Sequence, residues 1–119
     1  MPYIDAFILP VQIEHEAEYL RMAQDGCRIW MEHGALSYIE CRADDVPQGQ
    51  TTSFPLSVKL QPGEVVYVSY ITYRDRAHRD EVNAKVMADT RLHGYSMDRP
   101  VDMKRMIFGG FVPVVSATA

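Results

Sequence analysis

Polar side chains inside predicted strands are the residues of this chain whose types and spacing could do chemistry. Asp5 lies between Tyr3 and Phe7 in a short apolar stretch, and Glu40 and Arg42 stand two residues apart in a second one. A carboxylate that is half-buried beside aromatic rings has a raised pKa and can accept a proton from a bound molecule. Asp5 is therefore a candidate base.

The alternative role for Asp5 is structural. An ion pair with Arg42, or with an arginine of the last strand, would neutralise this carboxylate, and a position at the sheet edge would leave it in water. Charged residues inside folded domains are almost always paired or solvated. The simpler interpretation is therefore that Asp5 does no chemistry.

Aromatic side chains recur in the predicted strands and could form a pocket for a flat ligand. They are Tyr38, Tyr67, Tyr70, Tyr73 and Phe108. Aromatic residues in strands also serve as ordinary core or interface packing, which is the plainer interpretation. Taken with the polar residues, the candidates for a small-molecule pocket are Tyr3, Asp5, Phe7, Tyr38, Glu40 and Arg42.

No motif in the sequence assigns a reaction. The four histidines have neither HxH nor HxxxH spacing, and the two cysteines, Cys27 and Cys41, lack zinc-site spacing, so we predict no metal. A nucleophile elbow, a P-loop and the GxGxxG fingerprint are also missing from the sequence. We predict no cofactor, and whether the chain is an enzyme stays open.

Composition argues against several classes of protein. The 119 residues suffice for one core, so we predict a single domain over residues 1–119. A net charge of −4 without runs of Lys and Arg argues against nucleic-acid binding. No apolar run approaches the roughly 20 residues of a membrane helix, and the N-terminus has no cationic signal-peptide start. We expect a cytoplasmic protein that makes no membrane contact.

Hydrophobic periodicity predicts a strand, a helix and a strand in the first half of the chain. Residues 3–9 alternate as a strand that Pro10 ends. Residues 14–33 form the strongest helix, with Gly34 as its C-terminal cap. Residues 35–43 form the second strand. The apolar stripe of the helix is expected to consist of Ile13, Leu20, Ala23, Cys27, Trp30 and Met31.

The second half repeats this order. Residues 64–73 are mostly β-branched or aromatic and form the clearest strand. Asp75 caps a second helix that ends near residue 88. Residues 105–115 form the last strand, in which Gly109-Gly110 indicates a bulge or a close backbone approach.

Two units of strand, helix and strand predict an α+β, ferredoxin-like βαββαβ fold. Its sheet has four antiparallel strands, with both helices on one face. We expect Tyr3, Phe7 and Tyr38 to lie on the other face. Because a monomer rarely exposes a large apolar face, we predict a homodimer in which two such faces close over each other, with the pocket between the sheets.

Six segments together resemble a known bacterial family. They are YIDAF (3–7), WMEHGAL (30–36), DDVP (44–47), TSFP (52–55), VNAKVMAD (82–89) and KRMIFGGF (104–111). They are similar to the YbaA-like family, domain-of-unknown-function family 1428, over nearly the whole chain. The usual first segment of that family has Gly where this chain has Ala6. The resemblance implies a dimeric α+β barrel and no established activity.

Three functional hypotheses from different classes follow. The first is a small-molecule site, which by analogy with other proteins of the dimeric α+β barrel fold could belong to a cofactor-independent monooxygenase-like or isomerase-like enzyme. The second is a binding or regulatory module without chemistry, whose partner contacts would come from loops 44–53 and 90–103. The third, nucleic-acid binding, has no support in the charge of the chain.

Overall fold

Four strands and three helices follow one another in the part of the chain that the structure describes. The strands are β1 (Tyr3–Gln12), β2 (Ser37–Arg42), β3 (Glu64–Tyr73) and β4 (Ile107–Phe111), and the helices are α1 (Glu16–Glu32), α2 (Phe54–Ser57) and α3 (Arg76–Met87). Short 3₁₀ turns cover Ile13–His15 and Thr90–Leu92. The computed structural model describes residues 2–95 and 99–119, so part of the predicted loop 90–103 lies outside the described residues.

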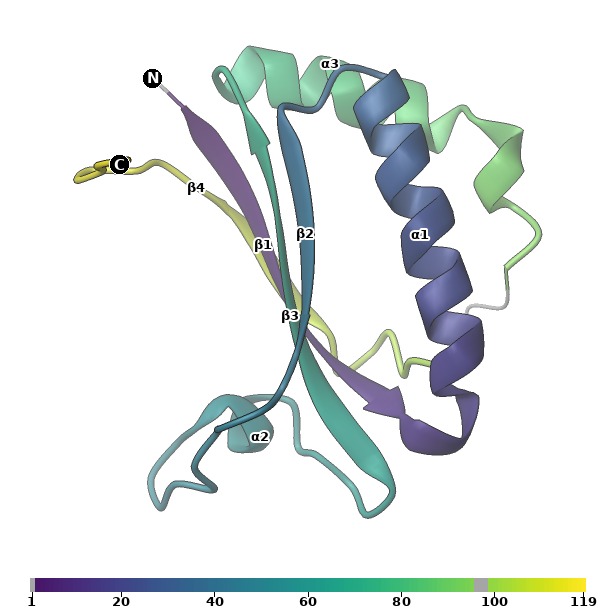
Figure 1. The fold of residues 1–119 in the computed structure, drawn as a ribbon, viewed down its shortest axis with the longest axis vertical. Coiled ribbons are helices and arrows are strands. Elements are labelled where there is room, and N and C mark those ends of the chain that lie inside the picture. Colours follow the sequence, from purple (N-terminus) through teal and green to yellow (C-terminus); the bar gives the residue numbers. More distant parts are fainter. Residues whose placement is uncertain (1, 96–98) are drawn as a thin grey trace.

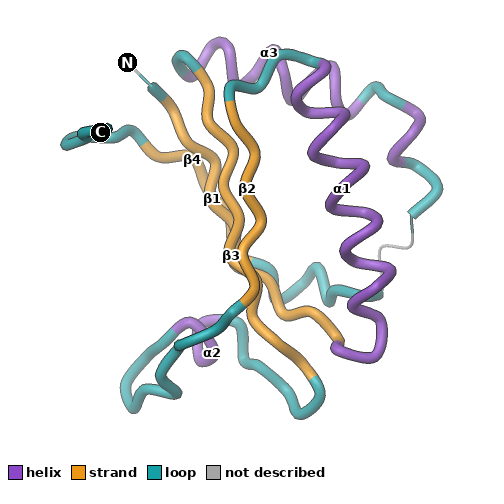
Figure 2. The backbone as a smooth tube through the Cα atoms, in the orientation of Figure 1, coloured by secondary structure: helices purple, strands orange, loops and turns teal. Residues whose placement is uncertain are grey.

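The strands form one antiparallel sheet in the order β2-β3-β1-β4. Figure 1 shows α1 and α3 on the same side of this sheet, which curves around them. The tube view in Figure 2 shows the chain after β4 leaving the sheet on the side away from α1. The predicted α+β, ferredoxin-like βαββαβ fold with its two long helices, α1 and α3, on one face is confirmed.

Cross-strand pairing assigns the side chains to two faces. On the face that α1 and α3 cover, one row runs Glu40, Ser69, Phe7 and Phe108 from β2 to β4. On the opposite face, which we call the open face, the middle row runs Ile39, Tyr70, Ala6 and Gly109. The prediction that Tyr3, Phe7 and Tyr38 lie on the open face is wrong, because the pairing places all three on the helix-covered face.

β1 is longer than predicted because Pro10 does not end it. Pro10 pairs with Val66 of β3, and the strand continues to Gln12. Gln12 donates its backbone N–H to Pro100, on the side of β1 away from β3. Alternate residues of a strand direct their N–H groups to the same side, so an N–H at position 10 would also point away from β3. β4 pairs only with Ile4–Ile8 and does not reach this position. The N–H that proline lacks is therefore not needed for pairing there.

α1 ends as predicted but buries a different stripe. Gly34 follows its last turn with φ of +113°, the left-handed geometry that glycine favours. The buried residues of the helix are Tyr19, Ala23, Gly26 and Ile29. Three residues of the predicted stripe, Ile13, Leu20 and Met31, are exposed instead. The prediction failed because α1 carries apolar residues around most of its circumference.

The segment around Pro55 forms a short helix. The Ser53 side chain accepts a hydrogen bond from the Leu56 N–H and caps α2, in which Pro55 takes a position in the first turn. Proline suits that position because the first turn of a helix does not use its N–H. Asp75 caps α3 in the same way by accepting from the His78 N–H, as predicted.

At Gly110 of β4 a side chain approaches the backbone closely, and the strand has no bulge. The β1–β4 register runs without interruption from Ile4↔Phe111 to Ile8↔Ile107. A Cβ atom on Gly110 would lie only 2.7 Å from Cε2 of Tyr3 and would meet its hydroxyl as well. Glycine therefore lets the buried Tyr3 ring lie directly against the backbone of β4.

Candidate functional site

A cavity of about 780 Å³ lies between the helix-covered face of the sheet and the two helices α1 and α3. Residues of the segment 99–106 and of β4 also line it. This volume falls within the range of small-molecule sites in proteins. The structure therefore places a hollow on the covered face of the sheet, whereas the sequence predicted a pocket on its open face.

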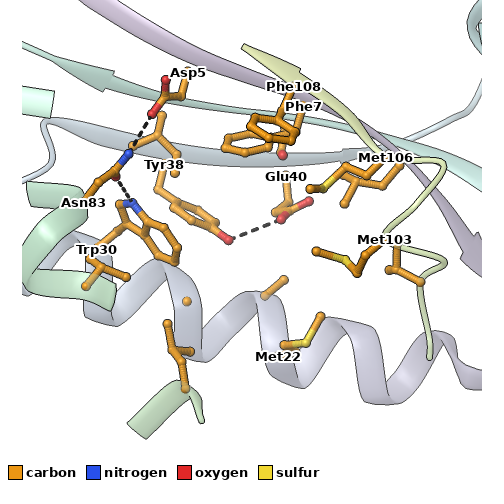
Figure 3. Close-up of a pocket in the computed structure, with 18 of the residues that line it drawn as sticks. Asp5, Phe7, Met22, Trp30, Tyr38, Glu40, Asn83, Met103, Met106 and Phe108 are labelled. Carbon is orange, nitrogen blue, oxygen red and sulfur yellow. Dashed lines mark hydrogen bonds between the residues drawn. The ribbon is translucent and has the colours of Figure 1, made fainter. Parts of the chain in front are cut away.

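Most of the cavity wall is apolar. The sheet contributes Phe7, Leu9, Ile71 and Phe108, and α1 contributes Met22, Ala23 and Trp30. Figure 3 shows Met103 and Met106 facing Met22 across the space, from the segment that precedes β4. Methionine side chains adapt their shape readily, so this wall can fit ligands of different outline.

Glu40 is the main polar group in this apolar surrounding. Its two carboxylate oxygens accept from the Tyr19 hydroxyl at 3.1 and 2.9 Å, and one of them also accepts from the Tyr38 hydroxyl at 3.2 Å. Tyr38 comes from the same strand and Tyr19 from α1, so the carboxylate is held between sheet and helix. Gly26 of α1 leaves room for Tyr38, since a Cβ there would lie 3.1 Å from its hydroxyl oxygen.

Burial changes the protonation of this cluster. Desolvation raises the pKa of Glu40 above the ordinary glutamate value, and the hydrogen bonds from Tyr19 and Tyr38 only partly offset it. Burial, together with the charge of Glu40, raises the pKa of both tyrosines far above the physiological range. The tyrosines thus stay hydrogen-bond donors, and Glu40 is the group of the cluster that can exchange a proton.

We expect Glu40→Gln to stabilise the protein more at pH 7 than at pH 4. The folded-state pKa of Glu40 is raised, so the wild-type free energy of unfolding falls as pH rises from the ordinary glutamate pKa through the folded one. Glutamine carries no charge, so the variant does not lose this stability as pH rises. Urea unfolding of both proteins at the two pH values measures the difference.

Glu16→Gln is the matched control for that titration. Hydrogen bonds from Arg42 and Tyr67 lower the pKa of Glu16, so its stabilising contribution is present above the ordinary pKa and is lost as pH falls. The pH dependence of the two variants should therefore have opposite signs. The same sign for both would contradict the assignment of Glu40 as a desolvated carboxylate.

A second polar cluster lies at another end of the cavity, around the buried Asp5. Arg79 of α3 donates to Asp5 at 2.6 Å, and the Asn83 amide donates to its other oxygen at 3.3 Å. The Trp30 indole N–H donates to the Asn83 oxygen at 3.2 Å, which links α1 to the same network (Figure 3). Asp5 is therefore paired, as the structural interpretation required, but with an arginine of α3.

The structure separates the six predicted pocket residues into two groups. Asp5, Phe7, Tyr38 and Glu40 line the cavity. Tyr3 is buried in the core with the Arg79 guanidinium 4.9 Å above its ring centre. Arg42 lies outside the cavity and forms an exposed ion pair with Glu16 at 2.6 Å. Four of the six candidates therefore surround the same space.

Several cavity residues were missed by sequence reasoning. Tyr19, Met22, Gly26, Arg79 and Asn83 line the space, and all of them come from α1 or α3. The spacing of Tyr19, Met22, Ala23, Gly26 and Trp30 does follow one helix face, at intervals of three and four residues. That signal was present in the sequence, but the stronger apolar residues Leu20 and Met31 obscured it.

No group of three or more His, Cys, Asp or Glu side chains in residues 2–95 and 99–119 is arranged to hold a metal ion. Across the same residues, none of the helices is long and apolar enough to cross a membrane. Cys27 and Cys41 are both free thiols.

The family profile described as protein of unknown function (DUF1428) matches residues 2–103. The chain belongs to this family. The uncharacterised protein YbaA of Escherichia coli strain K12 is 38% identical over 115 residues, which are 97% of this chain and 98% of YbaA. The YbaA protein of Shigella flexneri matches to the same extent. These matches confirm the resemblance seen in the six sequence segments.

Solved structures share the fold at low sequence identity. A dimeric ferredoxin-like protein from an uncultured marine organism has a TM-score of 0.60 and 12% identity, over 98% of this chain and 100% of that one. An uncharacterised NIPSNAP domain protein from Burkholderia xenovorans has a TM-score of 0.57 and 15% identity, over 98% and 99%. Rv0793 from Mycobacterium tuberculosis has a TM-score of 0.54 and 15% identity, over 99% and 100%.

Proposed function

We propose that this protein is a homodimer that binds a small, largely apolar molecule in the cavity between its sheet and its helices. The observation that carries the proposal is an apolar cavity of about 780 Å³ that holds a carboxylate, Glu40, bonded to two tyrosine hydroxyls. A well-formed apolar cavity with a few convergent polar groups is typical of ligand sites. The apolar wall would supply affinity, and the polar groups would orient the ligand.

The dimer is supported by the open face of the sheet. Two further rows flank its middle row. One runs Cys41, Val68, Ile8 and Ile107, and the other runs Ser37, Thr72, Ile4 and Phe111. Most of these side chains are apolar, and Ile39, Ile107 and Phe111 remain 37%, 42% and 59% exposed. A continuous apolar face of this kind is rare on a monomer. A second copy of the same face would cover it around a two-fold axis.

The structural comparison supports the same assembly. The marine protein with the highest of the three TM-scores is described as a dimeric ferredoxin-like protein. Its fold is similar to that of this chain. In such a dimer the cavity of each subunit stays on the outer, helix-covered side, so each subunit would bind its own ligand.

A cavity-filling variant tests the binding site. Ala23 is buried and lines the cavity, so Ala23→Leu should occupy ligand space and weaken binding by about tenfold or more. The neutral dye N-phenyl-1-naphthylamine serves as the probe. Trp30 is the only tryptophan of the chain and also lines the cavity, so transfer of its fluorescence to the dye reports binding there.

Ala17→Leu is the control for this substitution. Ala17 is exposed on the same helix and lies outside the cavity, so the added side chain should leave dye affinity unchanged. Equal dye affinity for wild type and both variants would contradict a ligand site in the cavity.

A further inference from the structure

The cavity wall carries an excess negative charge. Its described lining residues include two carboxylates, Asp5 and Glu40, one guanidinium, Arg79, and one imidazole, His93, which counts as neutral in the formal charge. Arg79 pairs with Asp5 at 2.6 Å and with the exposed Asp80 at 2.8 Å, so its charge is already compensated by these carboxylates. Glu40 has no Lys, Arg or His within ion-pair distance in the described part of the chain. One negative charge, that of Glu40, is therefore left without a counter-charge.

Glu40 retains capacity for one more donor. A carboxylate offers about four lone-pair positions on its two oxygens. The Tyr19 hydroxyl is shared between both oxygens and the Tyr38 hydroxyl reaches one of them. Figure 3 shows the Glu40 carboxylate directed into the cavity, where a ligand group can reach it. A donor on the ligand would complete its hydrogen bonding.

Aromatic rings surround the same space. Trp30 and Tyr38 lie with their ring centres 6.0 Å apart, and Phe7 and Phe108 stack at 6.3 Å across β1 and β4. The faces of aromatic rings attract organic cations. Rings and an unpaired carboxylate together favour a positively charged ligand over a neutral or negative one of the same shape.

We propose that the cavity binds an apolar organic cation, a primary ammonium group on an aromatic or alkyl skeleton, whose charged end meets Glu40. This inference rests on the proposed small-molecule site and names the class of its ligand. The ammonium group would donate to the free position on the carboxylate, and the skeleton would lie against the rings and the methionine wall. Such a ligand supplies the counter-charge that the wall lacks. Desolvation raises the pKa of Glu40, as expected for a buried carboxylate that has no cationic partner.

Three probes of nearly the same shape test the charge preference: 2-(1-naphthyl)ethylamine, 2-(1-naphthyl)ethanol and 1-naphthylacetate. Their affinities for the whole protein are measured at pH 7 by calorimetry. We expect the amine to bind about tenfold tighter than the alcohol, which corresponds to about 1.4 kcal/mol, and the acid to bind weakest. In Glu40→Gln the amine should lose its advantage over the alcohol, and circular dichroism checks that the variant is folded.

Glu16→Gln is the matched control, because Glu16 is likewise bonded to a tyrosine hydroxyl, that of Tyr67, but lies outside the cavity. It should leave the preference for the amine intact. Equal affinity of wild type for amine and alcohol overturns the ammonium inference while the proposed binding site stands. Failure of all three probes to bind contradicts the binding site and the inference with it.

Discussion

Ala6→Glu is expected to convert the proposed homodimer into a monomer. Ala6 lies in the middle row of the open face, on a central strand, between Tyr70 and Gly109. A two-fold interface would contain the substitution twice, so two carboxylates would be buried against apolar side chains without partners. Each such burial costs several kcal/mol, so we expect the dimer dissociation constant to rise by at least about a thousandfold.

Sedimentation velocity measures this change, and Ala17→Glu is its control. Ala17 is exposed on α1, away from the open face, so the same substitution there should leave the dimer intact. Circular dichroism should show a folded monomer for Ala6→Glu, because the new side chain faces solvent once the partner is gone. A stable Ala6→Glu dimer would show that the open face is not the interface.

Arg79→Met is expected to lower the free energy of unfolding by about 3 kcal/mol. Asp5 is only 6% exposed, and Arg79 is its single cationic partner among the described residues. Removing one member of a buried pair leaves the other charge desolvated, which is costly even though the intact pair itself contributes little. The Asn83 amide remains as a donor to Asp5 and limits the loss.

Urea unfolding at pH 7 measures the loss, with two companion variants. Arg76→Met removes an exposed arginine from the first position of the same helix and should change stability by less than about 0.5 kcal/mol. The double variant Asp5→Asn with Arg79→Met removes both charges and should recover much of the stability. A double variant that is no more stable than Arg79→Met alone would refute the ion-pair explanation.

The sequence predicted well those elements whose signals are local. The strand 64–73 has the predicted bounds because all of its residues except Glu64 and Ser69 are β-branched or aromatic. The Asp75 cap and the Gly34 terminus were also predicted, since each depends on the conformation of only a few neighbouring residues. The order of these elements along the chain was enough to predict the fold.

The faces of the sheet could not be predicted in the same way. β1 carries Tyr3, Phe7 and Leu9 on one face and Ile4 and Ile8 on the other, so alternation alone does not reveal which face the helices cover. The aromatic set was predicted to lie on the open face, and the structure places it under α1 and α3. The pocket was therefore predicted on the wrong face of the sheet.

The contacts that build the candidate site join distant parts of the chain. Tyr19 and Glu40 are 21 residues apart, and Asp5 and Arg79 are 74 apart. Neither pair leaves a spacing motif in the sequence, because only the packing of helices on the sheet brings its members together. Asp5 and Glu40 were selected as strand carboxylates, but their different partners, and so their different roles, appear only in the structure. The monooxygenase-like and isomerase-like alternatives stay predictions from the fold.

Native mass spectrometry of freshly purified, untagged protein tests the central claim, a homodimer with one ligand site in each subunit. With N-phenyl-1-naphthylamine added, we expect a dimer that takes up to one dye molecule per subunit and loses it under denaturing conditions. Ala23→Leu should form the same dimer with little or no dye. A monomer, or an Ala23→Leu dimer that takes as much dye as wild type, would contradict the claim.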